Sequence, residues 1–117
     1  MAVDISDDEF EDLVAEALDS IPQSFWERVD NLVVLIEPEA PESDPDLLGL
    51  YDGISLSERD TSYGMVLPDR VLVFREPLKR LAFDRADLAE QVVITVVHEI
   101  GHFFGFEDDD LDELGWG

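Results

Sequence analysis

Near the start of the chain, hydrophobic positions recur three and four residues apart, with acidic residues between them: Phe10, Leu13, Val14, Ala17, Leu18 and Ile21. This spacing places the apolar side chains along one face of a helix. Ser6 and Glu9 stand just before them in the S-x-x-E pattern of a capping box. The pattern therefore predicts a helix over residues 7–20, ended by Pro22, and a short helical piece within residues 22–31.

The middle of the chain carries short apolar segments rich in β-branched residues, a pattern typical of strands. The first spans residues 31–38, and the second spans residues 47–56 after a polar loop with two prolines. Gly49 and Gly53 interrupt the second segment. They indicate a bulge or a close approach by another part of the backbone.

Two further apolar stretches, residues 65–67 and 71–76, stand on either side of Pro68 and Asp69. Proline followed by aspartate favours a turn, so we predict two strands joined there by a hairpin or a broken turn. Residues 77–83 then predict a helical turn or short helix with Pro77 near its start, where a helix tolerates proline.

The segment from residue 85 to residue 104 fits two interpretations. Its centre, VVITVV, has the β-branched composition of a buried strand. No glycine or proline interrupts residues 86–100, however, and Asp84 is a suitable N-cap with acidic residues in the turn after it. One helical face would hold Leu88, Val92, Val96 and Phe103. We therefore predict one helix of about 20 residues, buried on most sides and ended by Gly105 in the left-handed conformation.

The size and composition fit one globular domain over residues 1–117, because 45% of the residues are hydrophobic and can supply a core. Acidic residues number 30 against seven basic ones, which gives a formal net charge of -23. Binding to nucleic acid or to an anionic membrane needs clustered lysine and arginine. We therefore expect neither of them as a partner.

The chain has no cysteine, which excludes disulfides, thiolate metal sites and cysteine nucleophiles. Its first residues lack the basic and apolar regions of a signal peptide. No apolar run approaches the roughly 20 residues that a membrane-spanning helix needs. These features lead us to expect a monomeric cytoplasmic protein.

Both histidines of the chain lie in the predicted long helix, in the sequence HEIGH. Residues four apart lie on the same helical face, so His98 and His102 can bind one metal ion. Glu99 is offset by one position and can act on a water molecule beside the metal without binding the metal. Zinc lowers the pKa of bound water toward about 7, and Glu99 is suited to take the proton. The motif therefore indicates a zinc-dependent hydrolytic site.

The residues after the motif bear on how the metal site is completed, since a catalytic zinc ion takes three protein ligands. Gly105 allows a sharp end to the helix, and Asp108 stands three residues later in the pattern H-E-x-x-H-x-x-G-x-x-D. The spacing favours Asp108 as the third ligand, with Glu107 and Asp109 as alternatives.

The extended motif resembles that of the metzincin branch of zinc peptidases, in which histidine usually takes the last position. The chain departs from full metzincins because its methionines, Met1 and Met65, cannot supply their downstream methionine turn. It more closely resembles the minimal zincin-like metallopeptidase domains of bacteria, over most of its length. The segments that carry this resemblance are FEDLVAEALDSIPQSFWERVDNLVVLIE, LLGLYDGISLSER, VLPDRVLVFREPLKR and the motif helix.

The resemblance implies an α+β, zincin-like fold, with a small twisted mixed sheet packed against an N-terminal helix and a long active-site helix. It implies one zinc ion per chain, bound by His98, His102 and Asp108, with Glu99 as general base in peptide-bond hydrolysis. It also implies an edge strand, formed by residues 65–67 or 71–76, that pairs with an extended peptide or protein substrate.

Two questions stay open at this level. A further group should stabilise the oxyanion, and because both histidines bind the metal the candidates are Tyr51, Tyr63 or an arginine among residues 70–80. The other question is activity. The missing methionine turn also fits a non-catalytic metal-binding or protein-interaction module that retains the zincin fold.

Overall fold

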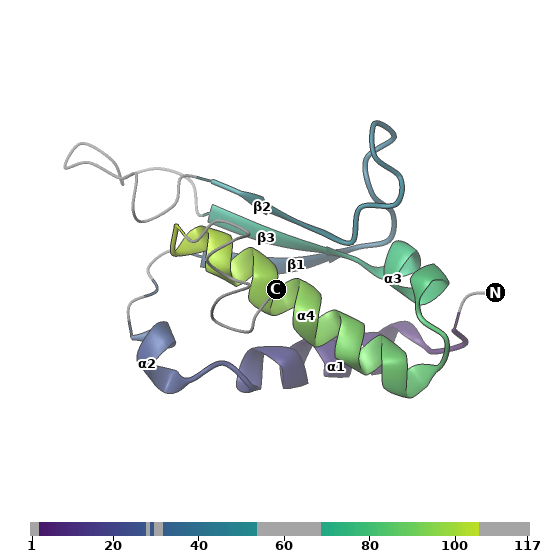
Figure 1. Cartoon of the computed structure of the whole chain (residues 1–117), viewed down its shortest axis with the longest axis horizontal. Coiled ribbons are helices and arrows are strands. Elements are labelled where there is room, and N and C mark those ends of the chain that lie inside the picture. Colours follow the sequence, from purple (N-terminus) through teal and green to yellow (C-terminus); the bar gives the residue numbers. More distant parts are fainter. Residues whose placement is uncertain (1–2, 28, 30–31, 54–68, 106–117) are drawn as a thin grey trace.

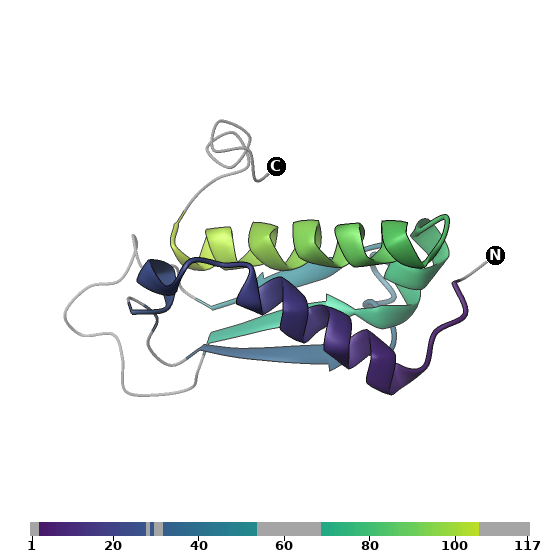
Figure 2. The same ribbon diagram turned by 90° about the horizontal axis from the view of Figure 1, so that it is seen from below.

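A computed structural model describes residues 3–27, 29, 32–53 and 69–105 of the chain (Figure 1). In chain order the elements are α1 (Asp7–Asp19), α2 (Gln23–Trp26), β1 (Leu32–Glu37), β2 (Gly49–Asp52), β3 (Asp69–Phe74), α3 (Arg75–Leu81) and α4 (Arg85–Phe103). The two long helices, α1 and α4, pack together on one face of the sheet, so the fold has a helical layer and a sheet layer (Figure 2). None of the described helices has the length and apolarity needed to cross a membrane.

The sheet is mixed, and β3 is its central strand. Val71 of β3 lies between Val34 of the parallel strand β1 and Tyr51 of the antiparallel strand β2. Side chains alternate between the two faces of a strand. Val71 and Val73 accordingly point into the core and are fully buried, whereas Arg70 and Leu72, which alternate with them, are exposed and half-buried respectively.

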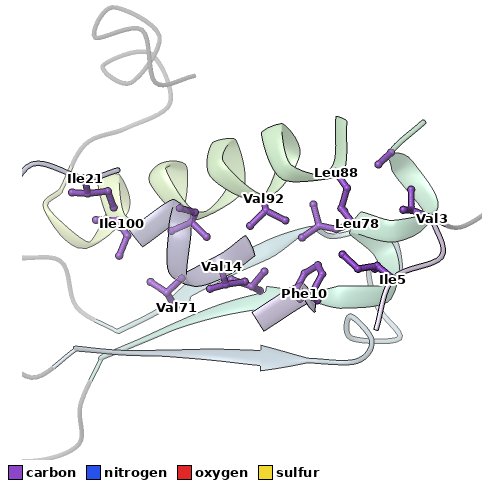
Figure 3. Close-up of a cluster of buried hydrophobic side chains, with 14 residues drawn as sticks. Val3, Ile5, Phe10, Val14, Ile21, Val71, Leu78, Leu88, Val92 and Ile100 are labelled. Atoms are coloured by element: carbon purple, nitrogen blue, oxygen red, sulfur yellow. The ribbon is translucent and has the colours of Figure 1, made fainter. Parts of the chain in front are cut away.

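The core lies between the helices and the inner face of the sheet (Figure 3). Most of its members come from α1, β3, α3 and α4, and the segments beside these helices add Val3, Ile5, Ile21 and Ala82. The largest fully buried side chains of the described residues are Phe10, Leu78, Leu88, Ile100, Val71, Val73, Val92, Val96 and Phe103. Burying an aliphatic side chain of this size contributes about 1.5–3 kcal/mol to the free energy of folding. The buried residues of α4 therefore hold this helix against the sheet.

The structure confirms the two predicted long helices, whereas the short helix α3 begins at Arg75, two residues before Pro77, and ends at Leu81. In α1, the Ser6 hydroxyl accepts a hydrogen bond from the Glu9 backbone N–H, and the Glu9 side chain accepts one from the Ser6 N–H, as a capping box requires. In α4, the Asp84 side chain accepts a bond from the Asp87 N–H at 2.8 Å. The VVITVV segment is therefore helical despite its β-branched composition.

The prediction for residues 71–76 as an edge strand is wrong. Residues 71–74 belong to β3 at the centre of the sheet, and Arg75 and Glu76 begin α3. Arg75 also forms an ion pair with Asp7, which connects α3 to the start of α1. A second contact of Arg75, a hydrogen bond from its side chain to Glu76, holds the pKa of Glu76 below the ordinary value. Among the described strands the edges are β1 and β2. The alternative edge segment, residues 65–67, lies outside the described residues.

The prediction of a turn at Asp69 is also wrong. Asp69 is the first residue of β3 and is 2% exposed. Its carboxylate accepts a hydrogen bond from the Tyr51 hydroxyl at 2.7 Å, across the antiparallel pair of strands. A partner 18 positions earlier stabilises a buried carboxylate that sequence alone assigns to a surface turn. The predicted second strand is shorter than expected and spans Gly49–Asp52, while residues 54–56 lie outside the described residues.

Candidate metal centre

The two histidines lie in the last two turns of α4. Packing fixes the orientation of this helix, because Val96, Ile100 and Phe103 are buried against the core. At about 100° per residue, His98 and His102 are then on the opposite side of the helix. The helix ends one residue before Phe104, and Gly105 follows with a φ of 92°, a left-handed conformation that glycine adopts at little cost.

The imidazole rings converge on a common point. The Nε2 atoms of His98 and His102 are 3.1 Å apart, and the ring planes cross at 81°. Two nitrogens bound to one tetrahedral zinc ion at about 2.0–2.1 Å would be roughly 3.3 Å apart. The carboxylate of Glu99 belongs to the same half-buried group, since ligand atoms of all three residues lie within 4.8 Å of one another. These residues therefore fit a metal ion.

The start of β2 positions Glu99 from the other side. A methyl group at Gly49 would come within 2.6 Å of Thr95 Cγ2 and 3.2 Å of Glu99 Cγ. Real Cβ contacts are essentially never under 3.0 Å, so only glycine lets β2 approach α4 this closely. The predicted close approach at Gly49 is thus present, but the nearest group is the side chain of Thr95 and not another backbone segment. Thr95, which contacts that glycine one turn before Glu99, was not predicted.

A cavity of about 350 Å³ borders the metal-ligand group. Its walls come from the segment that leads into β2, with Asp44, Asp46 and Leu47, and from α4, with Ile94, His98 and Glu99. The cavity residues outside the motif were not predicted from the sequence. The sequence did carry one signal for this cavity. Ile94 is a large apolar residue four positions before His98 and so lies on the same helical face, and in the structure it is 39% exposed.

Several predicted residues fall outside the described part of the chain: Asp108, its alternatives Glu107 and Asp109, and the oxyanion candidate Tyr63. Of the other oxyanion candidates, Tyr51 donates its hydroxyl proton to Asp69. The three arginines from residue 70 to residue 80 are in ion pairs with Asp52, Asp7 and Glu39 respectively. These contacts argue against an oxyanion role for the arginines, and none of them is among the residues that line the cavity.

A protein-family model matches most of the chain. The model is described as a zincin-like metallopeptidase, and it matches residues 29–116. A comparison with curated proteins found no match. The matched range contains the sheet, α3, the whole of α4 and the segment with Asp108, whereas α1 and α2 precede it.

Proposed function

The chain belongs to the zincin-like metallopeptidase family, and from this membership we propose that it is a zinc peptidase that hydrolyses peptide bonds with water. The observation that carries the proposal is the convergence of His98, Glu99 and His102 on α4, with ligand atoms within 4.8 Å of one another. In this proposal His98, His102 and Asp108 hold one zinc ion per chain.

Glu99 is the general base of the proposed reaction. Zinc bound at the site would supply Lewis acidity, which acidifies water and polarises the peptide carbonyl. The Glu99 carboxylate takes the proton of the attacking water and delivers it to the leaving amine nitrogen. Its position between the two histidines in sequence, and its contact with Gly49 on β2, support this role because they hold the carboxylate beside the ligand group.

The start of β2 is the proposed docking edge for an extended peptide. β2 pairs with β3 along one side and lies against α4 at Gly49. Within the described residues β2 has no second strand partner. An added peptide strand would hydrogen-bond to the backbone of this edge, which gives affinity without requiring a particular sequence.

Glu99→Gln is the direct test of the proposed role of this residue. We expect the variant to bind zinc like the native protein and to lose about 100- to 10,000-fold in kcat, the usual contribution of a general base. Zinc is measured by elemental analysis, and cleavage is measured on a proteome-derived peptide library with and without chelator. Glu90→Gln changes an exposed acid on the same helix and should leave both quantities unchanged.

The results separate the alternatives. A native protein that takes up no zinc at neutral pH without chelator contradicts the metal site. If the native protein and Glu99→Gln both bind zinc and neither cleaves any peptide, the result supports a non-catalytic metal-binding module instead.

The third ligand is tested in the same assay. Asp108→Asn should weaken zinc binding by more than the 10- to 100-fold that is typical of losing a residue that only supports a ligand. Glu107→Gln and Asp109→Asn remove the same unit of negative charge on either side and serve as matched controls. Equal effects for all three variants would mean that only the local charge matters and would remove Asp108 from the ligand set.

A further inference from the structure

The cavity beside the ligand group has walls of mixed character. Leu47 and Leu48 on one side and Ile94 on the other give it an apolar lining, and Ile94 is 39% exposed although it is a large aliphatic residue. Exposed apolar side chains that line a concave site are typical of ligand pockets. The volume of about 350 Å³ lies at the lower end of the range of such pockets, roughly 300–1,000 Å³.

The same cavity connects directly to the proposed catalytic group. His98 and Glu99 form part of its wall, and Gly49, which contacts Glu99, forms another part. A peptide whose scissile bond lies at Glu99 would therefore place the side chain of a flanking residue into this cavity.

Two acidic residues of the wall, Asp44 and Asp46, bear on which side-chain charge the cavity would favour. Asp44 and Asp46 are exposed, and neither forms an ion pair within the described part of the chain. Asp46 does lie near Arg80, because it contributes weakly to the raised pKa of that residue. The guanidinium of Arg80, however, is bonded to Glu39 by two nitrogens, at 3.0 and 3.3 Å, and this bond is the largest cause of the shift.

We propose that this cavity is the substrate side-chain subsite and that it selects lysine or arginine next to the cleaved bond. A long cationic side chain can lay its methylene stem along Leu47 and Ile94 while its charged end stays hydrated beside Asp44 and Asp46. The net charge of -23 adds a field that attracts cationic peptides. The inference rests on the proposed peptidase function and adds its substrate class.

The test uses synthetic peptides of one cleavable sequence that differ only at the residues flanking the cleaved bond, with lysine, norleucine or glutamate there. Norleucine keeps the stem of lysine and removes its charge. We expect zinc-loaded protein to prefer lysine over norleucine in kcat/KM. The double variant Asp44→Asn with Asp46→Asn should reduce that preference by about fivefold, the scale of two exposed ion pairs, and should leave the norleucine peptide unaffected.

Asp12→Asn with Asp19→Asn is the matched control, because it removes the same charge from exposed positions of α1. An equal loss of lysine preference in the control variant would overturn the inference, since it would assign the effect to net charge alone. Hydrolysis that shows no preference among the three peptides would overturn it as well and would leave the proposed peptidase function standing.

A second measurement separates the two proposals. Titration of isotope-labelled Glu99→Gln protein with the same peptides, followed by NMR, reports binding without turnover. The lysine peptide should bind more tightly and shift resonances of Leu47, Leu48 and Ile94, and Asp44→Asn with Asp46→Asn should remove the advantage. Charge-dependent binding at these residues without any hydrolysis by the native protein would contradict the proposed peptidase function. It would support the cavity as a binding site for a cationic side chain.

Discussion

Gly49 is the residue whose absent side chain most directly affects the proposed site. An added Cβ would meet Thr95 Cγ2 at 2.6 Å, the Leu72 carbonyl oxygen at 3.1 Å and Glu99 Cγ at 3.2 Å. Backbone on one side and a helix on the other leave little room for adjustment, so β2 and α4 would have to separate. The displaced group would include the proposed general base.

Gly49→Ala should therefore lower kcat by about 100-fold, the scale of a 1 Å misplacement, while zinc binding through the histidines persists. Thr95→Ser removes the methyl group that makes the closest contact, so combining it with Gly49→Ala should recover part of the loss. Leu50→Ala, on the outer face of the same strand, is the control and should keep near-native kcat. Loss of zinc binding in Gly49→Ala would instead indicate that the fold itself has failed.

Sequence alone identified the motif residues and left their neighbours undetermined. His98, Glu99 and His102 are close because helical spacing is local, and spacing is visible in the sequence. The contact between Gly49 and Glu99 joins residues 50 positions apart, so it depends on which strand packs against α4. The sequence indicated a close approach at Gly49, but it did not indicate that the side chains of Thr95 and Glu99 make it.

At the scale of elements, the two long helices were predictable and the order of the strands was not. The predictions for α1 and α4 used their own caps and periodicities, such as Ser6 with Glu9 and Asp84. Whether β3 lies at the centre or at the edge depends on β1 and β2, which no local pattern encodes. β3 has buried residues at both ends and fully buried Val71 and Val73, which fits a central strand.

The first helix, α1, precedes the range matched by the family model and still forms part of the core. Phe10 is fully buried, and Val14 and Ala17 of the same helix are also buried in the hydrophobic core. We infer from this packing that α1 and the matched range form one cooperative domain.

Phe10→Ala should therefore lower the free energy of unfolding by about 3–5 kcal/mol, the usual cost of emptying a buried phenylalanine site. Chemical denaturation followed by circular dichroism measures the change. Glu11→Ala, an exposed neighbour on the same helix, should stay within about 0.5 kcal/mol of the native protein. A Phe10→Ala effect as small as that of the control would mean that α1 is not part of the cooperative domain.

For the whole molecule, the surplus of acidic residues is the dominant electrostatic feature. Every lysine and arginine that the structure describes is already in an ion pair with a carboxylate: Arg70 with Asp52, Arg75 with Asp7 and Glu76, Lys79 with Glu76, Arg80 with Glu39 and Arg85 with Glu9. Three of these pairs, Arg70 with Asp52, Arg80 with Glu39 and Arg85 with Glu9, are exposed on both sides, and such pairs contribute about 0–1 kcal/mol each. The remaining acids, which give the net charge of -23, repel one another in the folded state.

Salt should therefore stabilise this protein. At about 0.01 M salt the Debye length is roughly 30 Å, so charges repel across a molecule with a radius of gyration of 14.4 Å. At about 0.15 M it falls to roughly 8 Å, and most of that repulsion is screened. Because screening weakens only a few exposed pairs, the repulsion term decides the sign. Between these two salt concentrations, Tm measured in the presence of chelator should rise by about 5 °C. This rise corresponds to roughly 1 kcal/mol in the free energy of unfolding for a domain of this size.

Differential scanning calorimetry in sodium chloride and in potassium chloride measures this dependence. The two salts should give the same rise, because screening depends on ionic strength and not on the identity of the cation. A rise in only one of them would indicate a specific cation site, and a fall in both would mean that the ion pairs outweigh the acidic surplus. The variant Asp12→Asn with Asp19→Asn sharpens the comparison, because removing two surplus charges from α1 should raise Tm at low salt and have less effect at high salt.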